Sequence, residues 1–243
     1  TSTAPLLLGQ SALEKLGEIK IDYQNQQLTI NSDNSKSVSA LDLLDNIDLS
    51  GFDSIVNSYI SDDSLKILLD KGEKGDTAAQ IFLAQLYYFG IRINEDNTKA
   101  FYWFNKASKN GCNTSYFYLG DIYDNGYGVT KDYTKAKYWY EKAANLDNAD
   151  AMDNLGLLYK NGNGVTKDYI KAKYWFEKAA NIGHNNAMNS LGLLYLNGQG
   201  VAKNYIKAKY WFEKSAEFNN KYAMCNLGIL YENGLGVPID ISV

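Results

Sequence analysis

The chain of 243 residues carries few side chains of the types that do chemistry. His184 is its single histidine, and Cys112 and Cys225 are its two cysteines, far apart and outside any Cys-x-x-Cys pair. A structural zinc site needs a close set of His and Cys ligands. The sequence therefore predicts no metal site and no cofactor, and we interpret His184 as a turn or surface histidine rather than a catalytic one.

A glycine-rich segment at residues 161–169 could suggest a phosphate site, because Gly162 and Gly164 precede Lys167. Close copies of this segment begin at Asn125 and Asn197. A dinucleotide fingerprint needs a strand before the glycines and a helix after them, and no strand pattern precedes these copies. We favour a turn between helices, in which Gly162 closes one helix and Asp168 caps the next.

The segments that position these loops repeat. Trp103, Trp139, Trp175 and Trp211 are the four tryptophans of the chain, each 36 residues after the one before. A self-similar period of about 20 to 50 residues marks an array of supersecondary units that bury their apolar faces against their neighbours. Two further positions keep this period, namely Leu83, Leu119, Leu155, Leu191 and Leu227, and Tyr87, Tyr123, Tyr159, Tyr195 and Tyr231.

Each repeat predicts two helices. In the third repeat Leu155, Gly156 and Tyr159 form one helical stripe, in which the glycine lets another helix approach closely. We name this helix A. Trp175 and Phe176 belong to a second stripe, helix B, where small residues alternate with large ones. We interpret the tryptophans as core residues and expect Trp175→Ala to cost about 3–5 kcal/mol.

Three motifs carry a family resemblance: Ala-x-x-x-Leu-Gly-x-x-Tyr, Asn-Gly-x-Gly-Val-x-x-Asp-Tyr and Lys-Ala-x-x-Trp-Phe/Tyr-x-Lys-Ala-Ala. In this order over residues 76–240 they resemble Sel1-like repeats, relatives of the tetratricopeptide repeat. The resemblance implies an all-α fold, a right-handed α-solenoid of helix-turn-helix repeats. The first repeat diverges at residues 92–97, and the last stops at Val243, where its helix B should begin. We therefore expect Leu227, Leu230 and Tyr231 to lack their partner helix.

Two consequences follow for the array at residues 76–243, which holds about four and a half repeats. Cys112 and Cys225 lie about three repeats apart, and each repeat of a solenoid touches only its neighbours. We expect both cysteines to be unpaired, buried small side chains. The lysines before each tryptophan are balanced by glutamates four residues on, as in Lys173 and Glu177. We therefore interpret them as a solvated helix face rather than a phosphate track.

Residues 1–30 follow another pattern. Ile19, Ile21 and Tyr23 alternate as in a strand, residues 24–27 supply a polar turn, and Leu28 and Ile30 resume the alternation, which predicts a β-hairpin. The segment Leu-Leu-Gly-Gln-Ser-Ala-Leu-Glu-Lys-Leu-Gly at residues 7–17, with the strand after it, resembles the C-terminal end of retropepsin-like aspartic proteases. The catalytic Asp-Thr/Ser-Gly turn of that family is absent, and Asp76-Thr77-Ala78 opens a helix instead.

The domain boundaries follow from these patterns. We expect a protease-like tail at 1–30, a Ser/Asn-rich linker at 31–39, a helical capping region at 40–75 and the repeat array at 76–243. Residues 41–47 and 52–60 are predicted helices, and Leu65, Leu68 and Leu69 could cover the first helix pair. We interpret the chain as a fragment of a longer protein.

The composition limits the classes of partner that the chain is expected to bind. The chain is 45% hydrophobic with a formal charge of −4, which suits an ordinary globular protein and gives no sign of nucleic-acid binding. No apolar run reaches the roughly 20 residues of a membrane helix. The expected partner is a protein or a peptide, and the cellular compartment and the oligomeric state stay open.

Candidate binding residues lie on helix A outside the recurring core positions. The resemblance implies that these residues line a concave face, and they differ between repeats, so they could read a ligand. The predicted positions are Ile81, Gln85, Tyr88, Phe117, Asp121, Asp124, Asp153, Leu157, Lys160, Asn189, Leu193, Leu196, Ile229 and Glu232.

Two functions remain open. The first, which we favour, is a scaffold that docks a protein or peptide segment. The second is the C-terminal part of a retropepsin-like peptidase, whose repeat array recruits substrates or partners. In either case we expect no proteolysis from this chain, because the turn that supplies the catalytic aspartate is missing.

Overall fold

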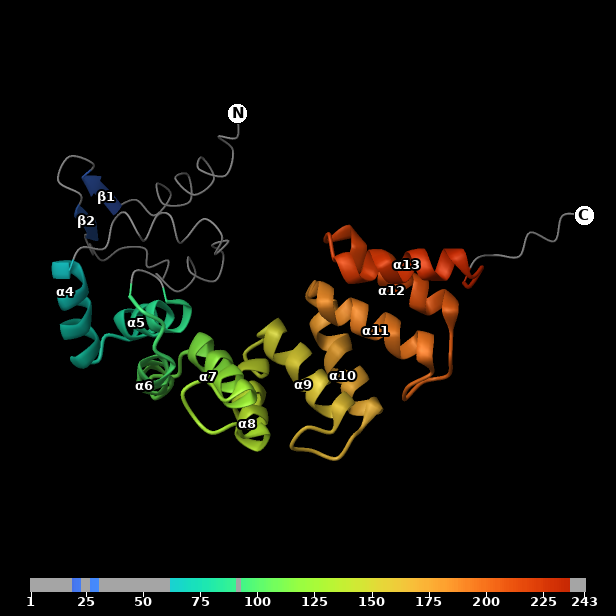
Figure 1. The fold of residues 1–243 in the computed structure, drawn as a ribbon, viewed down its shortest axis with the longest axis horizontal. Coiled ribbons are helices and arrows are strands. Elements are labelled where there is room, and N and C mark those ends of the chain that lie inside the picture. Colours follow the sequence, from blue (N-terminus) through green and yellow to red (C-terminus); the bar gives the residue numbers. More distant parts are fainter. Residues whose placement is uncertain (1–18, 23–26, 31–61, 91–92, 237–243) are drawn as a thin grey trace, which may run out of the picture. The chain divides into compact units, whose positions relative to one another are not determined.

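The structure is a computed structural model that describes residues 19–22, 27–30, 62–90 and 93–236. The chain divides into two compact units, Thr1–Gly111 and Cys112–Val243. Each unit is described separately below and is drawn in Figure 1.

The N-terminal unit contains a pair of antiparallel strands, β1 (Ile19–Asp22) and β2 (Gln27–Ile30). Ile19 lies opposite Ile30, and Ile21 lies opposite Leu28, so the two predicted strands do pair. Gln27 pairs with Asp22 and therefore belongs to β2 rather than to the turn. The turn itself, the rest of the predicted protease-like tail and the linker at 31–39 lie outside the described residues.

Three helices follow in the same unit: α4 (Asp62–Glu73), α5 (Thr77–Phe89) and α6 (Asn97–Ser108). Asp76 caps α5, because its carboxylate accepts a hydrogen bond of 2.9 Å from the backbone N–H of Ala79. α4 packs on α5, and a Cβ added at Gly72 of α4 would lie 2.9 Å from the Trp103 ring. The helices predicted at 41–47 and 52–60 lie outside the described residues.

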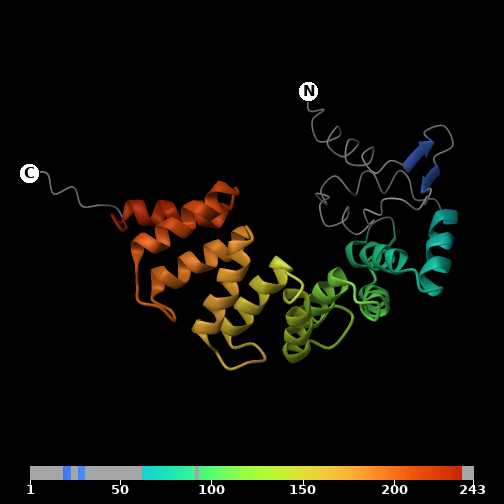
Figure 2. The ribbon, with the colours of Figure 1, turned by 180° about the vertical axis from the view of Figure 1, so that it is seen from behind.

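The C-terminal unit is a succession of helix pairs. Helices A are α7, α9, α11 and α13, and helices B are α8, α10 and α12. Helices α7, α9 and α11 each pack on the helix B that follows, and α8, α10 and α12 each pack on the next helix A. In both views the helices of a pair lie side by side (Figures 1 and 2). The bounds are Asn113–Asn125, Tyr133–Ala144, Ala149–Asn161, Tyr169–Asn181, Asn185–Asn197, Tyr205–Glu217 and Lys221–Glu232 for α7 to α13.

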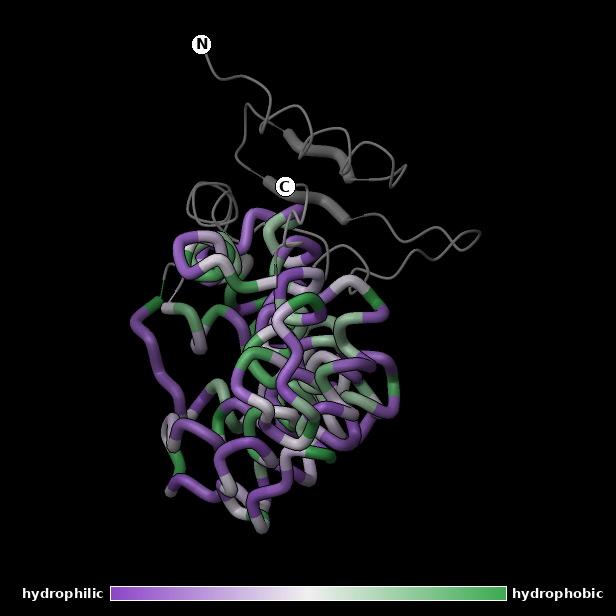
Figure 3. The backbone as a smooth tube through the Cα atoms, turned by 90° about the vertical axis from the view of Figure 1, so that its right-hand side faces the viewer, coloured by the Kyte–Doolittle hydropathy of each residue, from purple (hydrophilic) through white to green (hydrophobic). Residues whose placement is uncertain are grey.

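This arrangement confirms the predicted all-α solenoid of repeated helix pairs. Hydrophobic and hydrophilic residues are interspersed along the helical segments (Figure 3), as expected for helices that bury one face and expose the other. Alanines and large aromatic or aliphatic side chains alternate in the buried set of α8 to α11.

The helix A glycines do permit a close approach. A Cβ added at Gly156 would lie 2.4 Å from the ring of Phe176, and one added at Gly192 would lie 2.4 Å from Phe212. At Gly120 the corresponding distance, to Tyr140, is 2.5 Å. Each helix B thus seats one aromatic ring in the space that the glycine leaves.

The predicted core role of the tryptophans needs a correction. Trp103 is buried, but Trp139, Trp175 and Trp211 are only partly buried, whereas Phe176 is completely buried. One residue along a helix turns the side chain by about 100°. Since the residue after the tryptophan points at the glycine, the tryptophan itself lies at the edge of the helix interface.

The loop at residues 161–169 forms the predicted turn between helices. Gly162 ends α9 with a φ of 80°, and the Asp168 carboxylate caps α10 by accepting from the N–H groups of Ile170 and Lys171 at 3.0 Å. A helix, not a strand, precedes the glycines. Gly164, with a φ of 65°, lies against Tyr133, where an added Cβ would come within 2.5 Å.

The last described helix, α13, packs on the preceding helix B, whereas the predicted absence of a helix B after it falls on residues 237–243, which lie outside the described residues. Leu230 of α13 is fully buried and Leu227 partly so, because they pack against α12, although Tyr231 is 51% exposed. Around Gly228 the described residues place nothing within 4 Å of an added Cβ. Cys112 is buried, whereas Cys225 on α13 is exposed, which corrects the expectation of two buried thiols.

Candidate functional site

The predicted binding positions form a stripe on each helix A. On α9 they are Asp153, Leu157 and Lys160, at i, i+4 and i+7, which places them on one side of the helix. Asn226 of α13 donates a hydrogen bond of 2.9 Å to Asn189, one of these positions on α11, and so links two neighbouring helices A. We call the surface made by these positions of α7, α9, α11 and α13 the helix A face.

Most of the predicted residues in the C-terminal unit reach solvent. Ile229 is 51% exposed and Glu232 is exposed. Leu157, Leu193 and Leu196 are partly exposed while their remaining surface packs on the core. The other partly exposed positions are Phe117, Asp121, Asp124, Lys160 and Asn189.

Three predicted residues are buried instead. Ile81 and Gln85 of α5 are 0% and 6% exposed, and Asp153 of α9 is 7% exposed. Tyr88, also in the N-terminal unit, is half-buried and meets Phe104 edge to face. The spacing along one helix could not predict that these three residues are buried, because the side chains that cover them come from other helices.

Asp153 is the least expected group of the helix A face. Its Oδ1 atom is buried and accepts no hydrogen bond from the described residues. Burial disfavours the charged form and raises the pKa of Asp153 to about 6, an effect that the positive charge of His184 opposes. Asn189 occupies the same position one repeat later and uses its side chain oxygen to accept from Asn226.

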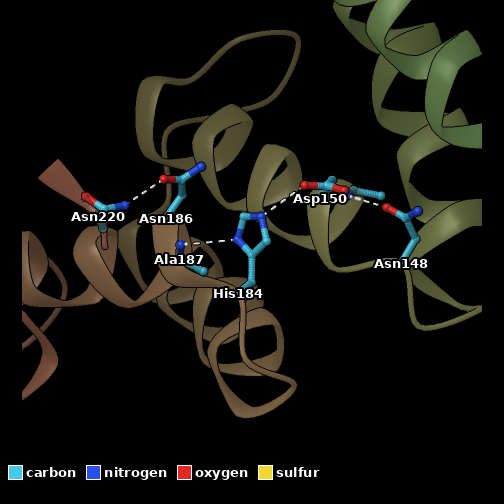
Figure 4. A network of polar contacts seen from close by, with 7 residues as sticks. Asn148, Asp150, His184, Asn186, Ala187 and Asn220 are labelled. Atoms are coloured by element: carbon cyan, nitrogen blue, oxygen red, sulfur yellow. Dashed lines mark hydrogen bonds and ion pairs between the residues drawn. The ribbon is translucent and has the colours of Figure 1, made fainter. Parts of the chain in front are cut away.

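Next to Asp153 a polar network joins successive helix A N-termini (Figure 4). The His184 ring accepts a hydrogen bond from the Ala187 N–H at Nδ1, 3.3 Å away, and thereby caps α11. Its Nε2 lies 3.0 Å from Asp150, so the neutral ring carries its proton on Nε2. At the following turn Asn220 donates to Asn186 at 2.8 Å. His184 is therefore a turn residue, as predicted, that also ties two repeats together.

Two opposing effects set the protonation of His184. Burial lowers its pKa, but the hydrogen bond to Asp150 and the charges of Asp153 and Asp150 outweigh burial and raise the pKa above the ordinary value. On α7, burial raises the pKa of Asp124, which accepts a hydrogen bond of 3.3 Å from the Tyr140 hydroxyl. The helix A face thus combines apolar side chains with carboxylates.

The sequence reasoning missed a second set of surface residues, on helix B. Tyr138, Tyr174 and Tyr210 are 50–51% exposed, and each meets the following tryptophan edge to face at 5.0–5.2 Å. Their recurrence at the 36-residue period was a visible signal, which the prominence of the tryptophans obscured.

Comparison with known proteins gives the family. The Sel1 repeat matches five consecutive segments, which together cover more than half of the chain: residues 77–112, 114–148, 149–184, 185–217 and 221–242. The chain belongs to the Sel1 repeat family. Sel1 repeat proteins act as protein–protein interaction scaffolds.

Solved Sel1 repeat structures share the fold. A protective antigen of uropathogenic Escherichia coli, c5321, superposes with a TM-score of 0.67 at 39% identity, over 71% of this chain and 37% of that one. A Sel1 repeat protein of Oxalobacter formigenes gives 0.65 at 31% identity, over 73% and 52%.

One curated relative also matches, the ERAD-associated E3 ubiquitin-protein ligase component HRD3B of Arabidopsis thaliana. It is 41% identical over 56 residues, which are 23% of this chain and 9% of that protein. The Sel1 repeat chain thus spans only part of the length of each of these relatives.

In the described part of the chain no His, Cys, Asp and Glu side chains gather in a group of three or more that could hold a metal ion. Among the same residues, no helix combines the length and the apolar character needed to cross a membrane.

Proposed function

We propose that this chain is an interaction scaffold that docks a protein or peptide segment on its helix A face. The observation that supports the proposal best is the row of partly exposed apolar residues, Leu157, Leu193 and Leu196, on two neighbouring helices. Leu157 and Leu193 hold the same position in adjacent repeats, but across the whole array this position varies, with Asp121 before them and Ile229 after them, while the core positions recur. A surface whose side chains vary while the core beneath it stays the same suits selective recognition of a ligand.

The chemistry of the face suggests the type of segment. Asp121 and Asp124 on α7 and Asp150 on α9 bring negative charge beside the leucines, with Lys160 as a nearby positive group. An apolar segment with basic side chains would complement this surface, whereas a polyanion would be repelled. Ile81, Gln85 and Asp153 are buried and are left out of the proposed contact.

The relatives support an assembling role. HRD3B is, by its name, a component of a ubiquitin-protein ligase, and thus part of a multi-protein assembly. The match covers a small part of that protein, so the likeness supports docking in general and names no partner for this chain.

The test is a capture experiment with the double variant Leu157→Glu plus Leu193→Glu. We expect the charges to abolish capture of a partner that the wild-type chain binds, in a variant that circular dichroism shows to be folded, because both side chains are partly exposed. The matched control is Ile170→Glu plus Ile206→Glu, which places the same charges on side chains 71% and 72% exposed on helix B. Unchanged capture by the first variant, or equal loss in the control, would refute the helix A site.

The peptidase alternative rests on residues 1–30, of which the structure describes only the paired strands β1 and β2. It stays a prediction about a longer protein. A coding sequence upstream of Thr1 that contains an apolar strand followed by Asp-Thr/Ser-Gly would support it.

A further inference from the structure

The N-terminal unit contains a carboxylate held on the exposed side of α6. Glu73, the last residue of α4, accepts a hydrogen bond of 3.0 Å from the Tyr102 hydroxyl at Oε1 and one from the Lys106 ammonium at Oε2. Tyr102 and Lys106 stand four residues apart on α6. The two donors therefore form a receptor for one carboxylate.

The receptor is preorganised by aromatic rings. The Lys106 ammonium lies 4.8 Å from the centre of the Tyr102 ring and 5.1 Å from that of Trp103. The Tyr102 ring itself meets Trp103 edge to face at 5.0 Å. A cation over aromatic faces gains electrostatic attraction and loses side chain freedom, which prepares it to bind an anion.

The same arrangement recurs in the C-terminal unit. Lys142 lies 5.0 Å from the Tyr138 ring and 5.2 Å from Trp139. Lys178 lies 5.1 Å from Tyr174 and 5.3 Å from Trp175. Each tyrosine again meets its tryptophan edge to face, at 5.0 and 5.1 Å.

The carboxylate is what these two copies lack. Glu73 precedes Lys106 by 33 residues, and the residues 33 positions before Lys142 and Lys178 are Lys109 and Asn145, neither of which is acidic. The nearby glutamates are occupied, since Glu141 pairs with Lys137 and Glu177 with Lys173, each at 2.6 Å. Within the described residues no carboxylate forms an ion pair with Lys142 or Lys178.

The third copy, Tyr210 with Lys214, differs. Lys214 donates to both carboxylate oxygens of Glu217 at 3.0 Å on its own helix. This lysine already has an anionic partner, so the third copy provides a comparison inside the same molecule.

Apolar side chains lie next to the open pairs. Leu146 follows Lys142 by four residues and Ile182 follows Lys178 by four, and they are 50% and 51% exposed. Leu146 lies two residues after the end of α8, and Ile182 lies directly after the end of α10, so both stand at the C-terminal end of a helix that carries an open pair.

We propose that the pairs Tyr138–Lys142 and Tyr174–Lys178 bind an acidic protein segment, whose carboxylates occupy the position that Glu73 fills in the first repeat and whose apolar side chains rest on Leu146 and Ile182. This surface belongs to helices B and is distinct from the helix A face. Its ligand has the opposite charge, so the two faces would recruit different segments.

A side chain carboxylate fits better than a polyanion. The bound example is one carboxylate that takes one hydroxyl and one ammonium donor. Glu141 and Glu177 stand directly before the lysines of the open pairs and balance Lys137 and Lys173, so this surface lacks the continuous positive charge that a nucleic acid or a sulfated polysaccharide would need. Separate carboxylates on a polypeptide avoid these positions.

The test uses the 243-residue chain and a short fluorescein-labelled peptide in which glutamates alternate with serine and leucine, followed by fluorescence anisotropy. We expect Lys142→Gln plus Lys178→Gln to weaken binding by about tenfold or more, since charge-assisted hydrogen bonds are the stronger ones. Tyr138→Phe plus Tyr174→Phe, which keeps the rings, should also weaken it. Lys214→Gln is the matched control and should change the affinity by less than about twofold.

Several results would overturn the proposal: no binding by the wild-type chain, equal binding of the same peptide with glutamine for glutamate, or an equal loss in Lys214→Gln. Binding of polygalacturonate in place of the peptide, with the same dependence on Lys142 and Lys178, would assign the surface to an anionic polysaccharide instead. Leu157→Glu plus Leu193→Glu should leave peptide binding unchanged, so failure of the helix A site and failure of this site are distinguishable. Circular dichroism melting would check that each variant is folded.

Discussion

Asp153 and Asn189 hold the same position in successive repeats but meet different surroundings. Asn189 accepts a hydrogen bond from Asn226 of the next repeat. The residue that corresponds to Asn226 for Asp153 is Ser190, and the Asp153 Oδ1 atom receives no hydrogen bond from the described residues. A buried carboxylate without its full set of donors favours the protonated form. This single group therefore makes the stability of the fold depend on pH.

We predict that Asp153→Asn stabilises the chain at neutral pH. The folded-state pKa of about 6 lies above the ordinary value of 3.8, so the folded chain binds the proton more tightly than the unfolded chain. The stability that this proton confers is present below about pH 4 and is lost as the pH rises to about 6. The variant should gain about 1–3 kcal/mol at pH 7.5 and nothing at about pH 4 in urea unfolding.

The control for this prediction is Asp147→Asn, an exposed carboxylate whose backbone has a φ of 59°, which asparagine also tolerates. It should leave the pH profile unchanged. The pKa of His184 is also raised, partly by the charge of Asp153, and the stability that its proton confers is likewise lost as the pH rises. The difference between Asp153→Asn and the control therefore includes the coupling of Asp153 to His184. A destabilising effect of Asp153→Asn at neutral pH would contradict the prediction. It would mean that the attraction between the Asp153 carboxylate and His184 outweighs the cost of burying the carboxylate.

At the scale of the element, the contact between helix A and helix B depends on a glycine. Gly192 faces the ring of Phe212, and Gly228 occupies the equivalent position on α13 with nothing within 4 Å. The two glycines have the same helical backbone role, yet only one of them is in contact with a helix B aromatic ring among the described residues.

We predict opposite effects of the same substitution at these two sites. Gly192→Ala should lower the free energy of unfolding by about 1–3 kcal/mol, because its Cβ would lie 2.4 Å from Phe212. Gly228→Ala should be neutral or stabilising by up to about 1 kcal/mol, since alanine is the better helix former. Chemical denaturation of both variants measures the difference. A destabilising Gly228→Ala would indicate a neighbour that the described residues do not include.

At the scale of the whole molecule, each helix pair of the C-terminal unit packs chiefly on the pairs beside it. The stability of such an array is a sum of repeat and nearest-neighbour contributions. A core defect should therefore spread to adjacent helices first and to distant ones least.

We predict that Phe176→Ala costs about 3–5 kcal/mol and that Trp175→Ala costs less, because Phe176 is fully buried and Trp175 only partly. In hydrogen exchange, Phe176→Ala should accelerate amides of α9, α10 and α11 before those of α13. Uniform acceleration across α7 to α13, or a larger cost for Trp175→Ala, would contradict this description.

The sequence alone determined the repeats, the helix pairs, the caps at Asp76 and Asp168 and the close approach at Gly156. These features depend on residues near one another in the chain, and the 36-residue period displays each of them several times. Spacing along one helix is enough to fix which side chains share a face.

Only the tertiary structure decided which of those side chains are buried or paired. Phe176 rather than Trp175 fills the helix interface, Asp153 is buried, and Glu73 joins Tyr102 and Lys106 from another helix. In each case the deciding neighbour comes from a different helix, so no pattern within one helix could reveal it. The acidic-segment surface on helix B follows from such a contact between helices, whereas the repeat family follows from the period.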